Sequence, residues 1–502
     1  MKAPTTLLDL LQLAPGDRTA IIVPELNLHI SYDSLRQQVM AVADALAAAG
    51  IRHGNRVAIV QPNGLPAIVC FLAAAITGTA APLNPAYPYE EFFFFLGDTS
   101  AHLLLCPHLG AEQARAAALD RGIRVLSVVM DPQGTVHIVH KREGTPAVPP
   151  SPEDVALILH TSGSTGRPKR VPLQHSNLVV SASNVADTYS LSPDDVSLCI
   201  MPLFHIHGMV ASTLAPLLSG GTVVVPTKFS PLTFWRTVHE HRVTWYSGVP
   251  TMHQLLLARA HGHKHHAGTL RFIRSASAPM PPEKIHKVEE LFGVPFVEAY
   301  GMTEASHQMA SNPLPPKHRK PGSVGPASGI RISIMDAQGK HLRKGERGEV
   351  VIQGPSIFDG YENNPEANAA SFVRGWFRTG DQGYLDADNY LHLTGRIKDL
   401  IIRGGENVAP REVDEVLLAH AAVAEAVTFA MPHPTLGEEV ASAVVLHEQG
   451  GAHESDLLKH CRERLAEYKC PKKVFIVPSI PLTATGKIRR QQVASAILDG
   501  QL

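Results

Sequence analysis

Nine residues from Thr161 to Lys169, TSGSTGRPK, combine four hydroxyl side chains, two glycines and a lysine. They follow the apolar run VALIL (155–159), which predicts a buried strand. A loop of this kind presents backbone N–H groups, hydroxyls and one positive charge together, and these are the groups that bind a polyphosphate. Its spacing, G-x-x-G-x-x-K, differs from that of a Walker A loop. Taken alone, the segment also fits a surface loop with a chance lysine, so other motifs must decide.

The composition limits the partners that such a loop can serve. The chain has 502 residues, which predicts two or three domains, and its 44% apolar and 18% charged residues are typical of a globular protein. Because 45 Lys and Arg are balanced by 46 Asp and Glu, we expect small-molecule partners and no nucleic acid. Five cysteines without a CxxC pair indicate neither a disulfide framework nor a structural zinc site, and they favour a reducing compartment.

No targeting or membrane segment is expected. The N-terminal apolar segment is cut short by APGDR, unlike a secretory signal, and the C-terminal ILDGQL does not match the peroxisomal S-K-L address. The uncharged stretch 57–89 is interrupted by prolines and a glycine, so it predicts a strand (57–60) and a buried helix (64–77) with no membrane span. We therefore expect a cytoplasmic protein. Its oligomeric state does not follow from any of these patterns.

Strand-like and helix-like segments alternate along the first 330 residues, which predicts an α/β fold with parallel-rich sheets and flanking helices. A Pro-rich stretch (145–154) predicts a connector between subdomains. Short strands around turns predict a small β unit over 330–397. After it, two helices and further strands predict a small α+β domain over 398–502, so the large N-terminal domain would span 1–397.

Five motifs occur in the order of a known family. TSGSTGRPK resembles the signature loop of the adenylate-forming acyl-CoA synthetases, the superfamily that includes firefly luciferase and the adenylation domains of peptide synthetases. YGMTE (300–304), FRTGD (377–381), GRIKDLIIRGGENVAP (395–410) and PLTATGKIRR (481–490) follow in the family's order. The resemblance spans nearly the whole chain. It implies an acid–thiol ligase with an N-terminal AMP-binding domain and a mobile C-terminal domain.

The resemblance implies a two-step reaction. A carboxylate attacks the α-phosphate of ATP to give an acyl adenylate and pyrophosphate, and the thiol of coenzyme A then displaces AMP. ATP, Mg²⁺ and coenzyme A are thus implied as cofactor and substrates, together with a small carboxylic acid. Glu304 would bind Mg²⁺, Thr303 would contact the α-phosphate, and Lys487 would bridge the acid and the α-phosphate. Nucleotide and phosphate contacts would come from Thr161, Ser162, Gly163, Ser164, Thr165, Gly166, Lys169, Tyr300, Gly301, Asp381 and Arg396.

For the second step the resemblance implies a rotation of the C-terminal domain about Lys398. Arg403, Gly404 and Gly405 would then line the tunnel for the pantetheine arm of coenzyme A. One position departs from the family pattern: Arg170 follows the loop lysine where many members have glycine.

The acid pocket is expected from PLFHIHG (202–208), RSASAPM (274–280) and the residues after YGMTE. Here His205, Ser277 and His307 offer polar groups where fatty-acyl relatives need apolar walls, and they would suit a short acid with a second carboxylate. His205 also corresponds to a histidine that gates the active site across the family. YGMTE reads as a strand-to-helix junction, which would put His307 on a helix.

These segments look most like the oxalate–CoA ligases of plants and fungi, a branch close to the coumarate ligases. Alternatives stay open: malonate, a short or medium-chain fatty acid, or an aromatic acid such as 4-coumarate as substrate. An acyl-AMP ligase that loads a carrier protein, a luciferase-like oxidising enzyme and an inactive nucleotide-binding scaffold are further alternatives. The intact set Lys169, Glu304, Asp381, Arg396 and Lys487 argues against the scaffold.

The segment HGHKHH (261–266) is rich in possible metal ligands. No cysteine or acidic partner follows it, and it falls between an expected helix (252–260) and an expected strand (270–274). We therefore expect no metal site there.

Overall fold

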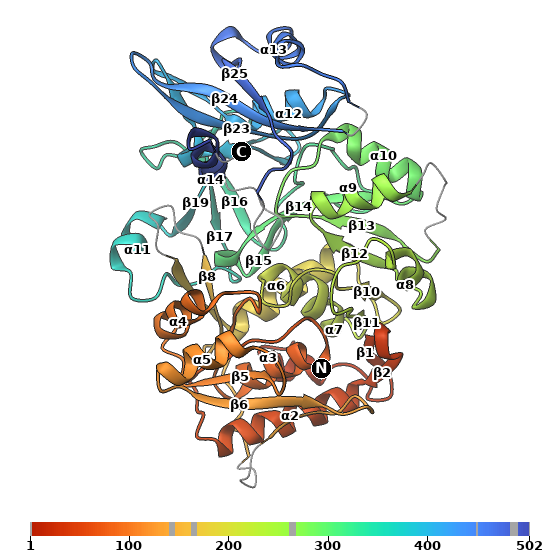
Figure 1. Cartoon of the computed structure of the whole chain (residues 1–502). Coiled ribbons are helices and arrows are strands. Elements are labelled where there is room, and N and C mark those ends of the chain that lie inside the picture. Colours follow the sequence, from red (N-terminus) through yellow and green to blue (C-terminus); the bar gives the residue numbers. More distant parts are fainter. Residues whose placement is uncertain are drawn as a thin grey trace.

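The apolar runs of the first 312 residues form two large sheets in this computed structural model, which describes residues 3–139, 146–161, 168–260, 268–447, 450–481 and 490–500 (Figure 1). The first sheet has seven strands and is parallel except at its two edges. In spatial order its strands are β7 (Val136–Ile138), β6 (Arg124–Met130), β5 (Leu103–Pro107), β3 (Arg56–Ile59), β4 (Thr79–Pro82), β8 (Val155–Thr161) and β9 (Lys169–Gln174). The described part of the predicted connector, 146–154, therefore joins two strands of one sheet.

The second sheet has eight strands and is likewise antiparallel only at its two ends. In spatial order its strands are β15 (His307–Ser311), β14 (Phe296–Met302), β13 (Phe272–Ser275), β12 (Trp245–Gly248), β10 (Val196–Leu198), β11 (Thr222–Val224), β1 (Thr19–Val23) and β2 (Leu28–Ser31). This architecture confirms the predicted α/β fold with parallel-rich sheets.

Helices cover both faces of each large sheet, so the strands are buried on both sides. The first sheet packs against α2 (Tyr32–Ala48) and α3 (Leu65–Thr77) on one face and α4 (Tyr89–Asp98) and α5 (Glu112–Asp120) on the other. The second sheet packs against α8 (Phe234–Glu240), α9 (Pro250–Arg259) and α10 (Pro282–Phe292) on its outer face. On its inner face lie α1 (Leu7–Leu11), α6 (His175–Tyr189), the π-helix η2 (His207–Leu214) and α7 (Ala215–Leu218).

Helix α3 is apolar around its whole circumference, and every residue from Ala67 to Thr77 is buried. It lies between α2 and the first sheet, which explains its composition without a lipid environment. Among the described residues, no helix combines the length and the apolar character that a membrane crossing requires. The uncharged stretch 57–89 thus forms core elements.

Two smaller sheets complete the chain, in the upper half of the molecule in Figure 1. One is antiparallel and contains β16 (Arg331–Met335), β17 (Gly348–Gln353), β18 (Phe372–Val373), β19 (Trp376–Leu385) and β20 (Leu391–Arg396), with α11 (Pro365–Ser371) beside it. The other contains β21 (Ile401–Arg403), β22 (Glu406–Val408), β23 (Val423–His433), β24 (Gly437–Leu446) and β25 (Lys473–Ile476). Helices α12 (Pro410–Leu418), α13 (Glu454–Arg462) and α14 (Arg490–Leu498) cover this last sheet. A contact from Lys284 Nζ to the Ala424 carbonyl, 3.3 Å, joins it to α10.

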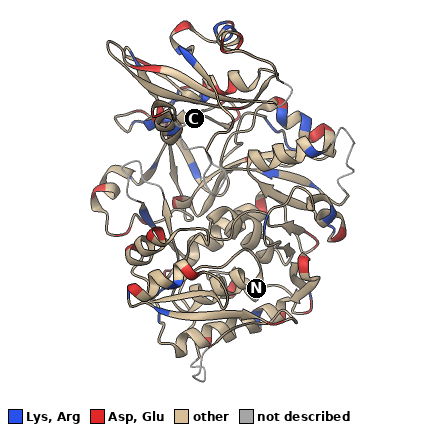
Figure 2. Ribbon diagram, in the orientation of Figure 1, with Lys and Arg blue, Asp and Glu red and all other residues tan. Residues whose placement is uncertain are grey.

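Acidic and basic residues are interspersed along the described parts of the ribbon (Figure 2). The five cysteines are free, and four of them are buried. The histidine-rich segment 261–266 lies outside the described residues.

Candidate active site

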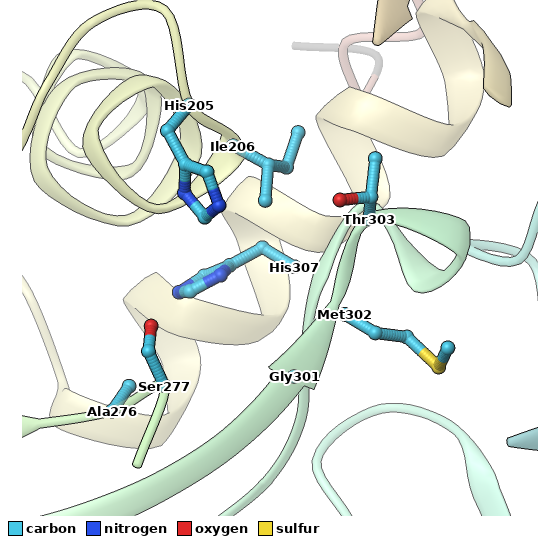
Figure 3. A pocket seen from close by; sticks show the side chains of 8 residues that line it. All are labelled: His205, Ile206, Ala276, Ser277, Gly301, Met302, Thr303 and His307. Atoms are coloured by element: carbon cyan, nitrogen blue, oxygen red, sulfur yellow. The ribbon is translucent and has the colours of Figure 1, made fainter. Parts of the chain in front are cut away.

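A cavity lies where three separate segments of the chain meet at the carboxyl ends of β13 and β14 (Figure 3). The space is small, and part of it is open to solvent. The wall consists of His205, Ile206, Ala276, Ser277, Gly301, Met302, Thr303 and His307. Ligands of α/β proteins commonly bind at such strand ends. The three segments from which the acid pocket was predicted therefore meet around one cavity.

The turn from β14 to β15 brings His307 into the cavity wall. A single 3-10 turn, η3 (Thr303–Ala305), joins the strands, and Ser306 and His307 follow with φ of 55° and 114°. These left-handed values end the turn and reverse the chain, so the predicted helix is wrong and His307 begins a strand. His307 is 3% exposed, so it is also not a surface residue.

Gly301 permits this reversal because β14 and β15 approach each other closely. A Cβ atom on Gly301 would lie 1.8 Å from the His307 carbonyl oxygen. Any side chain at position 301 would therefore push the two strands apart and move His307 in the cavity wall.

Gly301→Ala is expected to destabilise the fold by about 1–3 kcal/mol through overpacking and to displace His307. Chemical denaturation measures the first effect, and kcat/KM for the acid measures the second. Gly451→Ala is the matched control, because no atom lies within 4 Å of a Cβ built there. Equal stability of the two variants would contradict the argument from close approach.

His205 and Ser277 line the cavity from two different segments, one before η2 and the other after β13 (Figure 3). His205 lies just before η2, and its Nδ1 accepts a hydrogen bond from the backbone N–H of His207 at 3.2 Å. The neutral ring of His205 therefore carries its proton on Nε2. Ser277 follows β13 with φ of 77°, and its Oγ lies 3.4 Å from Nδ1 of His207. Ser277, Ser306 and His307 thus concentrate strained backbone around the cavity, as functional sites often do.

A second cluster joins YGMTE to FRTGD at the edge of the small antiparallel sheet. The Tyr300 hydroxyl donates to Oδ2 of Asp381, and Arg396 Nε lies 3.0 Å from Oδ1. Burial and the charge of Asp381 raise the pKa of Tyr300 well above its usual value, and Asp381 raises the pKa of Arg396. Asp381 is fixed by its pairing with Arg396 across β19 and β20 and by the Thr379 hydroxyl, which accepts from its N–H at 3.1 Å. Each carboxylate oxygen keeps a second lone pair for a ligand hydroxyl.

A third cluster connects Glu304 to the lysine of the glycine-rich loop. Glu304 Oε1 accepts from the Tyr361 hydroxyl at 2.9 Å, and burial raises the pKa of Glu304. The Nζ of Lys169 lies 4.5 Å from the centroid of the same Tyr361 ring, a cation–π contact. Lys169 and Thr161 are paired across β8 and β9, so the two residues that flank the glycine-rich segment lie side by side. Tyr361 therefore links the loop and YGMTE.

Arg170, the departure from the family pattern, anchors the segment that carries Tyr361. Its Nε lies 2.8 Å from Oε2 of Glu362, and its carbonyl accepts from the Glu362 N–H at 3.1 Å. It also donates to the Asp98 carbonyl of α4. Arg170 thus fixes the position of β9 where the loop returns to the sheet.

The remaining predicted residues lie apart from these clusters or outside the described part of the chain. Lys398 is exposed in the 3-10 turn η4 (Ile397–Asp399), between the two smaller sheets. Arg403 forms an ion pair with Glu439, and Gly404 and Gly405 make the turn from β21 to β22 with φ of 57° and 92°. The residues Ser162, Gly163, Ser164, Thr165, Gly166 and Lys487 lie outside the described residues.

Comparison with known proteins defines the family of this chain. Residues 12–362 match the AMP-binding enzyme family, and residues 412–487 match the AMP-binding enzyme C-terminal domain. The chain belongs to the AMP-binding enzymes. It is 45% identical to a probable CoA ligase, CCL9, of Humulus lupulus, over 98% of this chain and 97% of the relative.

Two further relatives of this AMP-binding enzyme are named for their acids. It is 42% identical to the oxalate–CoA ligase of Arabidopsis thaliana, over 96% of both chains. It is 37% identical to the sulfoacetate–CoA ligase of Cupriavidus necator, over 94% of both chains. Among solved structures, ATP-bound MatB from Rhodopseudomonas palustris superposes with a TM-score of 0.90 at 31% identity, over 99% of this chain and 100% of that chain. The protein is an AMP-forming acid–CoA ligase of the adenylate-forming superfamily.

Two buried residues of this AMP-binding enzyme were not identified from the sequence. Tyr361 is the first residue of YENNPEAN (361–368), and no sequence pattern indicates that it lies beside YGMTE. Arg274 is the first residue of RSASAPM. It is 0% exposed in β13, which is unexpected for a charged side chain.

Proposed function

We propose that this AMP-forming ligase activates oxalate and transfers it to coenzyme A. The observation that supports this proposal is the cavity wall: His205, Ser277 and His307 put three polar side chains around a small space. Carboxylate oxygens accept hydrogen bonds, and imidazole N–H and hydroxyl groups donate them. The identity to an oxalate–CoA ligase and to a sulfoacetate–CoA ligase supports an acid with a second anionic group.

In the first step the residues around YGMTE and FRTGD would hold the nucleotide. The Asp381 carboxylate would accept from the ribose hydroxyls, with Arg396 beside it, while Tyr300 and Gly301 would line the adenine. Thr303 of the cavity wall would contact the α-phosphate, and the loop residues from Thr161 to Lys169 would contact the remaining phosphates.

Glu304 fits the role of a magnesium ligand. The residue is 6% exposed, and among the described residues it forms no ion pair with Lys or Arg. A buried carboxylate without a cationic partner is costly, and a cation that also binds phosphate oxygens offsets that cost. Mg²⁺ bound there would neutralise charge on the phosphates, and Tyr361 would orient the carboxylate through its hydroxyl.

Tyr361→Phe is expected to raise the Mg²⁺ concentration required for half-maximal activity by about 10-fold, because partners that orient a ligating carboxylate typically matter this much. Adenylation at fixed ATP and varied Mg²⁺ measures the effect. Tyr390→Phe is the control, since it also loses a hydroxyl contact to a protein oxygen, the His318 carbonyl, and not to Glu304. An unchanged Mg²⁺ requirement in Tyr361→Phe would argue against Glu304 as the ligand.

In the second step a rotation about Lys398 would remove Lys487 from the site and bring in the turn Gly404–Gly405 with Arg403. The thiol of coenzyme A would then attack the acyl carbonyl, forming the thioester as AMP leaves. One site would thus serve both half-reactions.

The test is pyrophosphate release with ATP, Mg²⁺ and coenzyme A across oxalate, malonate, octanoate and 4-coumarate. We expect the highest kcat/KM with oxalate and a thioester on coenzyme A. Faster turnover of octanoate or 4-coumarate would refute the oxalate proposal. Thioester formation on a carrier protein but not on coenzyme A would refute the proposed acceptor.

A further inference from the structure

Arg274 is a buried cation directly behind the cavity wall. It is 0% exposed in β13, and among the residues that the structure describes it forms no ion pair with an aspartate or glutamate. The nearby Arg271, by contrast, pairs with Asp195 at 2.8 Å. Burial of a charge is costly unless hydrogen bonds or a counter-charge compensate it.

Neutral acceptors compensate the five N–H groups of Arg274. Its Nε donates to the Tyr189 hydroxyl at 2.9 Å, its Nη1 to Ser247 Oγ at 2.8 Å, and its Nη2 to Gln308 Oε1 at 3.0 Å. The other two contacts are with imidazoles: Nη1 lies 3.2 Å from His207 Nε2, and Nη2 lies 3.0 Å from His307 Nε2. The positive charge of the guanidinium therefore stays unneutralised within this set.

These contacts determine the tautomers of both histidines. A guanidinium only donates hydrogen bonds, so Nε2 of His207 and Nε2 of His307 must each accept. Both rings are therefore neutral, with the proton on Nδ1. The Ser247 hydroxyl, 2.7 Å from Nε2 of His207, is consistent with this assignment because it can donate to the same nitrogen.

The tautomers in turn determine which hydrogen-bonding groups the side chains of the cavity wall present. The Nδ1–H of His207 donates to Ser277 Oγ at 3.4 Å, so the Ser277 hydroxyl hydrogen is directed elsewhere. The His307 ring lines the cavity and carries a donor on Nδ1. His205 carries its proton on Nε2, as its contact with the His207 N–H requires. Each polar side chain of the wall thus has a hydrogen to donate.

We propose that Arg274 is a positioning and specificity residue, which makes the acid cavity a donor-rich, positively charged site for an acid with a second anionic group. The inference deepens the proposed function and rests on its assignment of the cavity to the acid. The guanidinium acts through His307 and, by way of His207, through Ser277. A dicarboxylate fits because its distal oxygens are acceptors and its charge is opposite to that of Arg274.

The experiment compares oxalate and malonate, each beside its monoamide, in which the second carboxylate is replaced by a neutral amide, in wild type, Arg274→Gln and Arg271→Gln. We expect wild type to prefer a diacid over its monoamide. Arg274→Gln should lower that preference by about 10-fold to 100-fold, with KM for ATP unchanged. Arg271→Gln, the matched control just before β13, should keep the wild-type preference. A ratio of two kcat/KM values is insensitive to the fraction of folded enzyme, so a merely structural role would not change it.

Each outcome decides the inference. An unchanged preference in Arg274→Gln overturns it. If Arg274→Gln does not fold, Ser277→Ala takes its place, and an unchanged preference in that variant overturns it equally. Wild type that uses malonate in place of oxalate refutes the oxalate proposal while the Arg274 inference stands. Wild type that uses the monoamides as well as the diacids overturns the inference even if oxalate is a substrate.

Discussion

Asp381→Asn is expected to lower kcat/KM for ATP by about 10²-fold to 10³-fold. The carboxylate would accept from both ribose hydroxyls, and each hydrogen bond to a charged acceptor contributes about 1.5–3 kcal/mol. The substitution also leaves Arg396, now 3.0 Å from Asp381 Oδ1, without its counter-charge. Pyrophosphate release at varied ATP measures the loss, which should appear mainly in KM for ATP.

Asp386→Asn is the matched control for this variant. Asp386 lies five residues further along, in the turn between β19 and β20, and pairs with Lys320 at 2.6 Å, away from the nucleotide residues. Its replacement should leave KM for ATP unchanged. A comparable loss in both variants would mean that Asp381 only stabilises the small sheet.

The second large effect is expected for Lys487→Ala, which should reduce adenylate formation by about 10²-fold to 10³-fold. This expectation comes from the resemblance of PLTATGKIRR, because Lys487 lies outside the described residues. A cation that bridges the attacking carboxylate and the α-phosphate acts only in the first half-reaction. Thioester formation from supplied acyl adenylate should therefore persist in Lys487→Ala.

Rapid-quench measurement of the two half-reactions separates these effects, with Lys472→Ala as the control on an exposed lysine of the same C-terminal region. Equal loss of both half-reactions in Lys487→Ala would contradict its assignment to adenylation. Loss of activity in Lys472→Ala would indicate a general charge effect.

Much of the fold was predictable because the strands are short apolar runs that end at recognisable turn residues. VALIL forms β8, and the uncharged stretch after residue 57 forms β3 and α3, as the sequence predicted. The cavity segments were also predictable: parallel strands put their carboxyl ends on one edge, so RSASAPM and YGMTE had to meet once they followed neighbouring strands.

The segment after YGMTE was not predictable from local pattern. Glu304, Ala305 and Gln308 favour a helix, yet the chain reverses at Ser306 and pairs β15 with β14. The close approach at Gly301 makes this pairing possible, and a contact between strands is a tertiary effect. Arg274 was missed for a similar reason: its acceptors come from Tyr189, Ser247 and Gln308, which are distant in sequence.

The arrangement of Arg274 also bears on how such an enzyme evolves. If the cavity holds the acid, as proposed, one way to admit a longer acid is a small residue at position 307, but this would remove one of the five acceptors and leave a guanidinium N–H unpaired in the core. If Arg274 were removed first, its acceptors would lose their donor instead, among them Gln308 and Ser247. Either single substitution would therefore destabilise the protein. A change of preference to a longer acid would then require several substitutions at once. On the proposed function, a polar network behind the pocket, and not the pocket wall alone, would restrict the acids that this scaffold can acquire by mutation.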